Sequence, residues 1–424
     1  MTSRAAGWRL AHGAATVLVS LLSLAPGRAA FAQDPHAGMD MGERGRGWTF
    51  MQDATVYLMF NDQGSPRGTR EVKAPNWWMG MGQKRAGKGQ LTVTLMLSLD
   101  PATVGRQGYS HIFEIGESFD GNPLIDHQHP HDFLMQAAAV WRQPLANGIS
   151  LTLAGAAVGE PALGPVAFMH RSSAAENPMS PLGHHTFDSS HIAMGVLTAS
   201  LDRGPFQVES SLFNGAEPDE HRWDLMDRGP LDSWSVRGWY RPSPAWSFQV
   251  SHGFLTQPEA LEEGDVRRTT ASGSWLKARG DGSTAIIVAW GRNLKLGGAY
   301  DAYLAEMTRA RRAATLFWRV EATQVETDVL RTGVHTAGRG RKTAHVTGIG
   351  TRDFVGAVSA GATRTVWRPR SWDVAAGGQI TGYAVPKTLS PFYGDTPWSF
   401  QVFLHVRPPA MHRMLDTIMT RPPM

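Results

Sequence analysis

The chain contains no cysteine among its 424 residues, which excludes a disulfide framework and a thiolate metal site. It also lacks a dominant charge: 41 Lys and Arg stand against 37 Asp and Glu, a formal net charge of +4. Three of the arginines (Arg4, Arg9 and Arg28) lie close to the N-terminus, and the other basic residues are scattered rather than gathered in stripes. This pattern argues against nucleic acid as a partner.

A second long apolar run is missing as well. The first, residues 14–25, is shorter than the roughly 20 residues that a membrane helix needs. It follows Arg4 and Arg9 and precedes an A-x-A site at Ala30 to Ala32, which is the layout of a secretory signal. We therefore expect a cleaved signal peptide over residues 1–32. An uncleaved signal anchor is the alternative, but no basic stop-transfer cluster follows the run.

The chain is rich in glycine and tryptophan, with 46 and 15 residues, and its apolar residues alternate with polar ones. The clearest example is 398–406, where Trp398, Phe400 and Val402 are separated by polar residues, and similar alternation recurs at 91–97, 149–153, 206–212, 246–251 and 316–321. Period two over about ten residues is typical of transmembrane β-strands. A soluble β-sandwich is the alternative, with shorter strands.

Short and long connections alternate between these runs. Tight turns with Gly, Pro, Asn or Asp occur at 86–89, 144–148, 202–205, 242–245 and 279–282. Longer polar stretches cover 61–74, 100–131, 158–190, 214–233, 255–267 and 325–342. This asymmetry predicts an all-β fold: an antiparallel transmembrane β-barrel over residues 48–406, with short periplasmic turns and long external loops. We expect 14–18 strands, with 16 as the preferred number.

Tryptophans near the expected strand ends predict an aromatic girdle at the membrane interfaces; they are Trp77, Trp78, Trp141, Trp239, Trp246, Trp275, Trp290 and Trp398. Outer-membrane lipid and the barrel-assembly machinery are the expected partners, and the cell outer membrane is the expected location. Residues 33–47 are polar and Gly-rich, and we expect a disordered segment bearing His36, Met39 and Met41. A proline-bearing C-terminal tail is expected over 407–424.

Residues 126–132 read DHQHPHD. In an extended strand, His127, His129 and His131 would point the same way, and we expect Asp126 and Asp132 to flank them on that face. Neutral imidazole together with carboxylate suits zinc, copper(II), nickel or iron. A proline at 130 limits strand pairing, so a loop or a strand edge is expected here. A hydrogen-bonded structural cluster is the alternative.

A second histidine-bearing stretch follows, in the loop 158–190 and the residues after it. The hairpin order places this loop and the loop 100–131 on the same side of the barrel, so both could converge over its mouth. We expect a shared site for a divalent metal, copper or zinc, with ligands drawn from Asp126, His127, His129, His131, Asp132, His170, His184, His185 and His191. Glu160 and Asp188 lie in the same stretch.

Enzymatic alternatives have weaker support. The order H-x-H-x-H-D departs from the H-x-H-x-D-H of metallo-hydrolases of the β-lactamase fold, and the alternating strands and helices of that fold are missing. Ser189, Ser190 and His191 are adjacent, which leaves a membrane-embedded lipid hydrolase as an alternative function, although no Gly-x-Ser-x-Gly elbow occurs. We expect a protein that is not an enzyme. A structural barrel with a hydrogen-bonded histidine plug is the third possibility.

Several fragments resemble an uncharacterised family of exported bacterial outer-membrane β-barrel proteins. They are PLIDHQHPHD at 123–132, GEPALGP at 159–165, PLGHH at 181–185, FNGAEPDE at 213–220 and PFYGD at 391–395. The resemblance runs along most of the mature chain and implies a barrel, without an activity. A looser resemblance, to the copper-resistance outer-membrane protein B family, implies copper. The expected function is metal binding or guidance by His-rich loops, with porin-like passage of small solutes.

Overall fold

The computed structural model describes residues 47–226, 229–262, 264–295, 298–332, 352–369 and 372–408. The expected signal peptide, nearly all of the segment 33–47 and nearly all of the tail 407–424 lie outside the described residues, and these expectations remain predictions. No helix within the described residues is long and apolar enough to cross a membrane.

Within the described residues, sixteen antiparallel strands form the wall of a barrel. They are β1 (Thr49–Gly64), β3 (Asn76–Ala86), β4 (Gly89–Leu97), β7 (Leu134–Pro144), β8 (Ile149–Gly159), β9 (Ala193–Arg203), β10 (Phe206–Phe213), β11 (Ser233–Ser243), β12 (Trp246–Leu255), β13 (Val266–Arg279), β14 (Gly282–Lys295), β15 (Gly298–Arg311), β16 (Ala314–Glu326), β17 (Arg352–Trp367), β18 (Asp373–Ala384) and β19 (Trp398–Arg407).

The barrel is closed. Each wall strand pairs with its neighbour in sequence, and β19 pairs back onto β1 from Val56 opposite Val406 to Gly64 opposite Trp398. The short strand β2 (Arg70–Lys73) adds to the external half of β1. Closure satisfies the backbone groups that a free sheet edge would leave unpaired. The predicted all-β fold and the preferred count of 16 strands are confirmed.

Alternation along each strand separates the two faces of the wall. On β19 the side chains of Trp398, Val402 and Leu404 are exposed on the outer face, whereas Ser399 and Gln401 are buried inside. The same pattern recurs around the barrel, so its outer face is largely apolar and its inner face polar. An apolar outer band over a polar interior is the arrangement of a barrel in lipid.

The expected tryptophan girdle is only partly present. Trp246 and Trp398 are exposed on the outer face, as a girdle requires. Trp77 and Trp239 are buried and face inward, which corrects the expectation for these two residues. Trp239 donates its indole N–H to Glu209, at 2.8 Å. Position near a strand end does not determine which face a side chain occupies, because that depends on the parity of the register.

The connections follow the predicted asymmetry. Tight turns join the strands at one end, and at the other end loops run over 98–133, 160–192, 214–232, 256–265 and 385–397. The first loop carries α2 (Asp100–Thr103) and a separate hairpin of β5 (Tyr109–Phe119) and β6 (Asn122–Gln128). The second carries α3 (His184–Phe187). Two further short helices are α4 (Thr327–Thr332) and α5 (Ser390–Tyr393).

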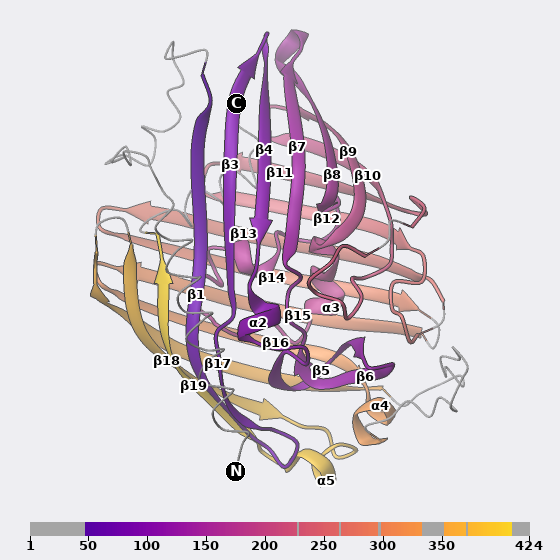
Figure 1. Ribbon diagram of the computed structural model, residues 1–424, viewed down its shortest axis with the longest axis vertical. Helices are drawn as coiled ribbons and strands as arrows, with labels where there is room; N and C mark the ends of the chain where they lie inside the picture. The colour runs from indigo at the N-terminus through magenta and orange to yellow at the C-terminus, as the bar shows by residue number, and fades with distance from the viewer. Residues whose placement is uncertain are drawn as a thin grey trace.

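The loop 160–192 fills the barrel, and nearly all of its residues are buried. Arg171 holds it to the wall by donating from Nε to Glu306 on β15, at 2.8 Å. Arg319 on β16 donates to the backbone oxygen of Met179, at 2.9 Å. Figure 1 shows α2, α3 and the β5–β6 hairpin within the outline of the wall. We refer to loops 98–133 and 160–192 together as the plug.

Candidate metal centre in the plug

Five imidazole rings meet where the two plug loops touch. His129 and His131 come from the first loop, and His184, His185 and His191 from the second. Ring centroids are 5.2 Å apart for His184 and His191, 5.3 Å for His184 and His185, and 6.0 Å for His131 and His191. His129 lies 5.9 Å from His184 and 5.6 Å from His185. The structure thus brings together five of the nine residues in the predicted site.

Three of these rings are held in one orientation by hydrogen bonds from Nδ1. His131 donates to Asp100 at 2.8 Å, and His184 donates to the Asp188 carboxylate at 2.7 Å. His191 donates to the backbone oxygen of Asp188, also at 2.8 Å. Because the acceptors are a carboxylate or a carbonyl oxygen, the proton lies on Nδ1 and the lone pair on Nε2. Metal-binding histidines in proteins are typically oriented in this way.

The Nε2 atoms of His131, His184 and His191 are buried and have no hydrogen-bond partner. A buried polar atom without a partner is costly and calls for an explanation. A bound metal ion would supply the missing partner. We call His131, His184 and His191 the three-His centre.

The spacing of the rings is compatible with a shared ion. Two imidazoles on a tetrahedral ion, with metal–nitrogen bonds of about 2.0 Å, have ring centroids about 5 Å apart. His184 and His191 are at that separation, and His131 and His191 are somewhat further apart. The Nε2 atoms of the three histidines are not all within 4.8 Å of one another, so binding would draw His131 inward.

Burial keeps two of these imidazoles neutral, those of His184 and His191. It lowers the pKa of His191 to about 3, with neighbouring His184 and His131 acting in the same direction. Burial also lowers the pKa of His184, although the hydrogen bond to Asp188 opposes it. Burial alone would raise the pKa of Asp188, but Arg171 and His184 hold it below its usual range. At neutral pH the imidazoles of His184 and His191 are therefore neutral and lie beside the ionised carboxylate of Asp188, which is the protonation state that a metal needs.

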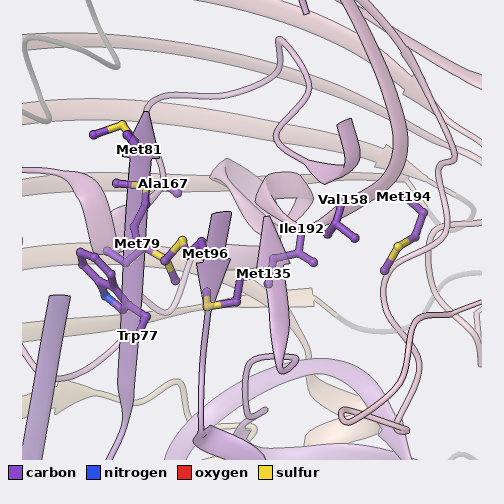
Figure 2. Packing of buried hydrophobic residues seen from close by; sticks show 10 residues of the cluster. Trp77, Met79, Met81, Met96, Met135, Val158, Ala167, Ile192 and Met194 are labelled. Atoms are coloured by element: carbon purple, nitrogen blue, oxygen red, sulfur yellow. The ribbon is translucent and has the colours of Figure 1, made fainter. Parts of the chain in front are cut away.

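A methionine-rich cluster borders the centre inside the barrel. Its buried members are Trp77, Met79, Met81, Met96, Met135, Val158, Ala167, Met169, Ile192 and Met194, and Figure 2 shows their packing. A small cavity lies between this cluster and the histidines, lined in part by Met135, Met169, His170 and His191. The sequence interpretation noted only Met39 and Met41. The inward positions of the strand methionines were the signal that could have revealed the cluster.

His170 belongs to this border rather than to the ring cluster. Its imidazole packs edge-on against Trp77, with ring centroids 5.1 Å apart, and its Nδ1 is buried without a hydrogen-bond partner. Burial lowers the pKa of His170 to about 4. His170 and His191 both line the small cavity.

Asp126 and His127 lie apart from the five rings. The expectation that Asp126 shares the histidine face is wrong, since neighbouring strand positions face opposite sides and Asp126 has a φ of +58°. Its carboxylate accepts hydrogen bonds from Arg67 at 2.7 Å and from Tyr393 at 2.9 Å. His127 donates from Nδ1 to the backbone oxygen of Ile125 at 3.0 Å. Both residues have structural partners of their own.

Asp132 also departs from the expected ligand set. Its carboxylate lies 3.4 Å from Arg222 of the loop 214–232. Arg222 also pairs with Glu117, and Glu117 lies 3.1 Å from Nε2 of His129. Asp132 and Glu117 therefore link the plug to a third loop. The sequence interpretation did not identify Glu117 or Asp100 because their histidine partners lie 12 and 31 positions away.

The serines give no support to a hydrolase. Ser189 accepts a hydrogen bond from Arg268 at 3.0 Å, and the hydroxyl of Ser190 is buried without a partner. Nδ1 of His191 donates a hydrogen bond to the backbone oxygen of Asp188, and no described contact joins His191 to either hydroxyl. A nucleophile needs its base within hydrogen-bond reach.

No protein-family model and no curated protein sequence matches the chain. Solved porin structures do. The structure of OprB from Pseudomonas putida is similar with a TM-score of 0.52 at 9% identity, covering 86% of this chain and 94% of that one. An anion-selective porin from Comamonas acidovorans is similar with a TM-score of 0.51 at 8% identity, covering 85% and 100%. The chain therefore has a porin-like β-barrel fold.

Proposed function

We propose that this protein is an outer-membrane barrel that binds or guides a divalent metal of the copper or zinc class at the histidines of its plug. The observation that carries the proposal is the three-His centre: Nδ1 of each ring is anchored, and each Nε2 is buried without a partner. In a purely structural cluster these three Nε2 atoms would stay without a partner. The alternative of a hydrogen-bonded histidine plug explains only the Nδ1 contacts.

The surroundings favour copper over zinc. Imidazole suits both metals, but thioether sulfur is a soft ligand that suits copper. Met135 and Met169 line the cavity beside His191, and further methionines extend away from it along the inner wall. An ion leaving the histidines on this side meets more thioether groups than carboxylates, since Met96 lines the cavity as well. The one carboxylate lining this cavity is that of Glu160.

The test is metal retention by the full chain, purified in detergent. The protein is loaded with Cu²⁺ or Zn²⁺, dialysed and analysed for metal content and affinity. We expect the His131→Gln/His184→Gln/His191→Gln variant to lose affinity by more than the roughly 10–100-fold that loss of an outer-shell partner costs. The matched control is His221→Gln/His252→Gln, because both of these histidines are exposed.

Heat-modifiable gel migration would establish that both variants fold as barrels. Equal metal retention by the triple variant and the wild type would refute the proposed centre. Equal loss in the triple variant and in the control would also refute it, since the metal would then be bound at the surface. Phospholipid hydrolysis that disappears with Ser189→Ala would instead support the hydrolase alternative.

Passage of a small solute is the second proposed activity, and the porin-like fold together with the polar inner wall favours it. The buried plug restricts such passage. Arg171 anchors the plug to the wall by pairing with Glu306 on β15, and it pairs with Asp188 within the plug, both at 2.8 Å. Replacing Arg171 with methionine leaves two buried carboxylates short of a partner, so the loop should detach from the wall. We expect a higher single-channel conductance for Arg171→Met; unchanged conductance would argue against a displaceable plug.

A further inference from the structure

A second group of possible ligands lies on the external side of the histidine cluster. His185 of the plug lies between Glu217 of the loop 214–232 and Glu259 of the loop 256–265. Nδ1 of His185 is 3.4 Å from a Glu217 oxygen and 3.6 Å from a Glu259 oxygen. Among the described residues, one possible ligand atom from each of these three side chains lies within 4.8 Å of the other two.

These separations suit a shared ion better than direct hydrogen bonds. Hydrogen bonds between nitrogen and oxygen are about 2.7–3.2 Å long. Two neighbouring ligand atoms on one ion lie about 3.1 Å apart in octahedral geometry and, with bonds of about 2.1 Å, about 3.4 Å apart in tetrahedral geometry. The two distances from His185 are close to the larger value.

Two of the three side chains also lack hydrogen-bond partners, whereas Glu259 accepts one from the backbone N–H of Glu117, at 3.2 Å. Both carboxylate oxygens of Glu217 and both ring nitrogens of His185 are buried without a hydrogen-bond partner. Only 8% of the Glu217 side chain is exposed. An ionised carboxylate that is nine-tenths buried needs a counter-charge, because its desolvation is expensive. One oxygen of this carboxylate is aimed at the His185 ring.

We propose that His185, Glu217 and Glu259 form a second cation site, separate from the three-His centre. One imidazole with two carboxylates is a harder ligand set than three imidazoles, and it suits Mn²⁺ or Fe²⁺ better than copper. The site is reached from the external side, since 20% of the Glu259 side chain and 14% of the His185 side chain are exposed, against 1% for His184. A bound ion would join three loops of the mouth.

The nearby charges leave a place for a cation. Glu114 lies 3.9 Å from Nε2 of His185, and burial raises its pKa, so it is not counted among the charged ligands. Arg268 is the neighbouring positive group, and it donates to the backbone oxygen of His185 at 2.7 Å and to Ser189. These hydrogen bonds of Arg268 do not go to the carboxylates of Glu217 and Glu259, so the proposed ion would be their counter-charge.

The test uses Mn²⁺ as the probe, with the full-length protein in detergent and free Mn²⁺ measured by electron paramagnetic resonance. We expect the wild type to bind Mn²⁺ and Glu217→Gln/Glu259→Gln to bind it at least about 10-fold more weakly, since affinity falls with ligand charge. Asp219→Asn removes an exposed carboxylate from the same loop and should bind like the wild type.

The two metal sites can be tested separately. His131→Gln/His191→Gln disables the three-His centre and should leave Mn²⁺ binding intact. If the wild type binds Mn²⁺ no more tightly than the Glu217→Gln/Glu259→Gln variant, the second site is refuted. The second site is also refuted if Mn²⁺ binding is lost in His131→Gln/His191→Gln but kept in Glu217→Gln/Glu259→Gln, because the ion would then occupy the three-His centre. Copper binding in the carboxylate variant reports on the proposed function independently.

Discussion

At the scale of single residues, Asp188 connects the metal centre to the wall of the barrel. One carboxylate oxygen accepts from His184 at 2.7 Å, and its backbone oxygen accepts from His191 at 2.8 Å. The other carboxylate oxygen accepts from Arg171 at 2.8 Å, and Arg171 in turn holds Glu306 on the wall. One aspartate thus orients two of the three proposed ligands and fixes the loop that carries them.

Replacement of Asp188 by asparagine should therefore weaken metal binding without removing a ligand. Loss of an outer-shell carboxylate typically lowers metal affinity by about 10–100-fold, because the ring orientation and basicity are no longer fixed. Competition with a chelator of known affinity measures the change. Asp100→Asn is the comparison: it affects only His131 of the three ligands, so its effect should be the smaller one. A larger effect from Asp100→Asn would contradict the central role of Asp188.

Glu160 gives the plug a specific pH dependence. Burial raises the pKa of Glu160 to about 7, although Arg237 opposes this rise. Since the pKa in the folded protein is above the unfolded value, the folded state binds more protons between about pH 4.5 and 7. The contribution of Glu160 to stability is therefore present at low pH and is lost as the pH rises through 7.

The variant Glu160→Gln isolates this effect. It should equal the wild type in thermal stability near pH 4.5 and exceed it at pH 8, because glutamine cannot ionise. The midpoint temperature of heat-modifiable gel migration, followed from pH 4.5 to 8, measures both proteins. Arg237 keeps Glu209 as its partner in the variant, at 2.8 Å. Parallel curves for the two proteins would show that Glu160 titrates at its ordinary pKa.

At the scale of elements, the sequence predicts the strands of the barrel wall but only part of the arrangement of the loops inside the barrel. Alternation defined the strands, and Gly- and Pro-rich turns placed the histidine loops on the same side of the barrel. The contacts among the rings depend on how loops fold inside the barrel, which no local pattern encodes. Asp126 shows the limit: a single positive φ turns its carboxylate toward Arg67 and Tyr393. The role of Glu217 depends on a third loop 32 positions from His185 along the chain.

Strand β5 contributes to the second cation site through its backbone. Gly116 has a φ of +157°, and a Cβ there would come within 2.2 Å of the His185 ring. The replacement Gly116→Ala should displace this ring from its position beside Glu217 and Glu259 without removing any ligand. We expect weaker Mn²⁺ binding with copper binding retained. Gly121→Ala, at the tip of the same hairpin where a Cβ meets no neighbour, is the matched control. Equal Mn²⁺ affinity in the two variants would argue against His185 as a ligand.

At the scale of the whole molecule, the barrel presents exposed apolar side chains on nearly every strand of its outer face. A water-soluble barrel could not keep such a belt exposed, whereas lipid covers it at no cost. The same belt explains why the buried charges lie inside the barrel: there Arg171 of the plug can pair with Glu306 of the wall, and Glu306 with Arg319, away from lipid. The buried charges inside the barrel and the apolar outer face of its wall therefore depend on each other.

A charge placed on the outer face tests whether the belt lies in lipid. Val288 is in the middle of β14 and 59% exposed, and Leu294 is near the external end of the same strand and 46% exposed. Lysine at the centre of a bilayer costs about 2–4 kcal/mol, and near the interface about 0–1 kcal/mol. Val288→Lys should therefore destabilise the barrel in vesicles far more than Leu294→Lys, as measured by urea unfolding. Both positions are exposed, so a water-soluble barrel would tolerate the two lysines equally. Equal stability of the two variants in vesicles would therefore show that the apolar outer face does not lie in lipid.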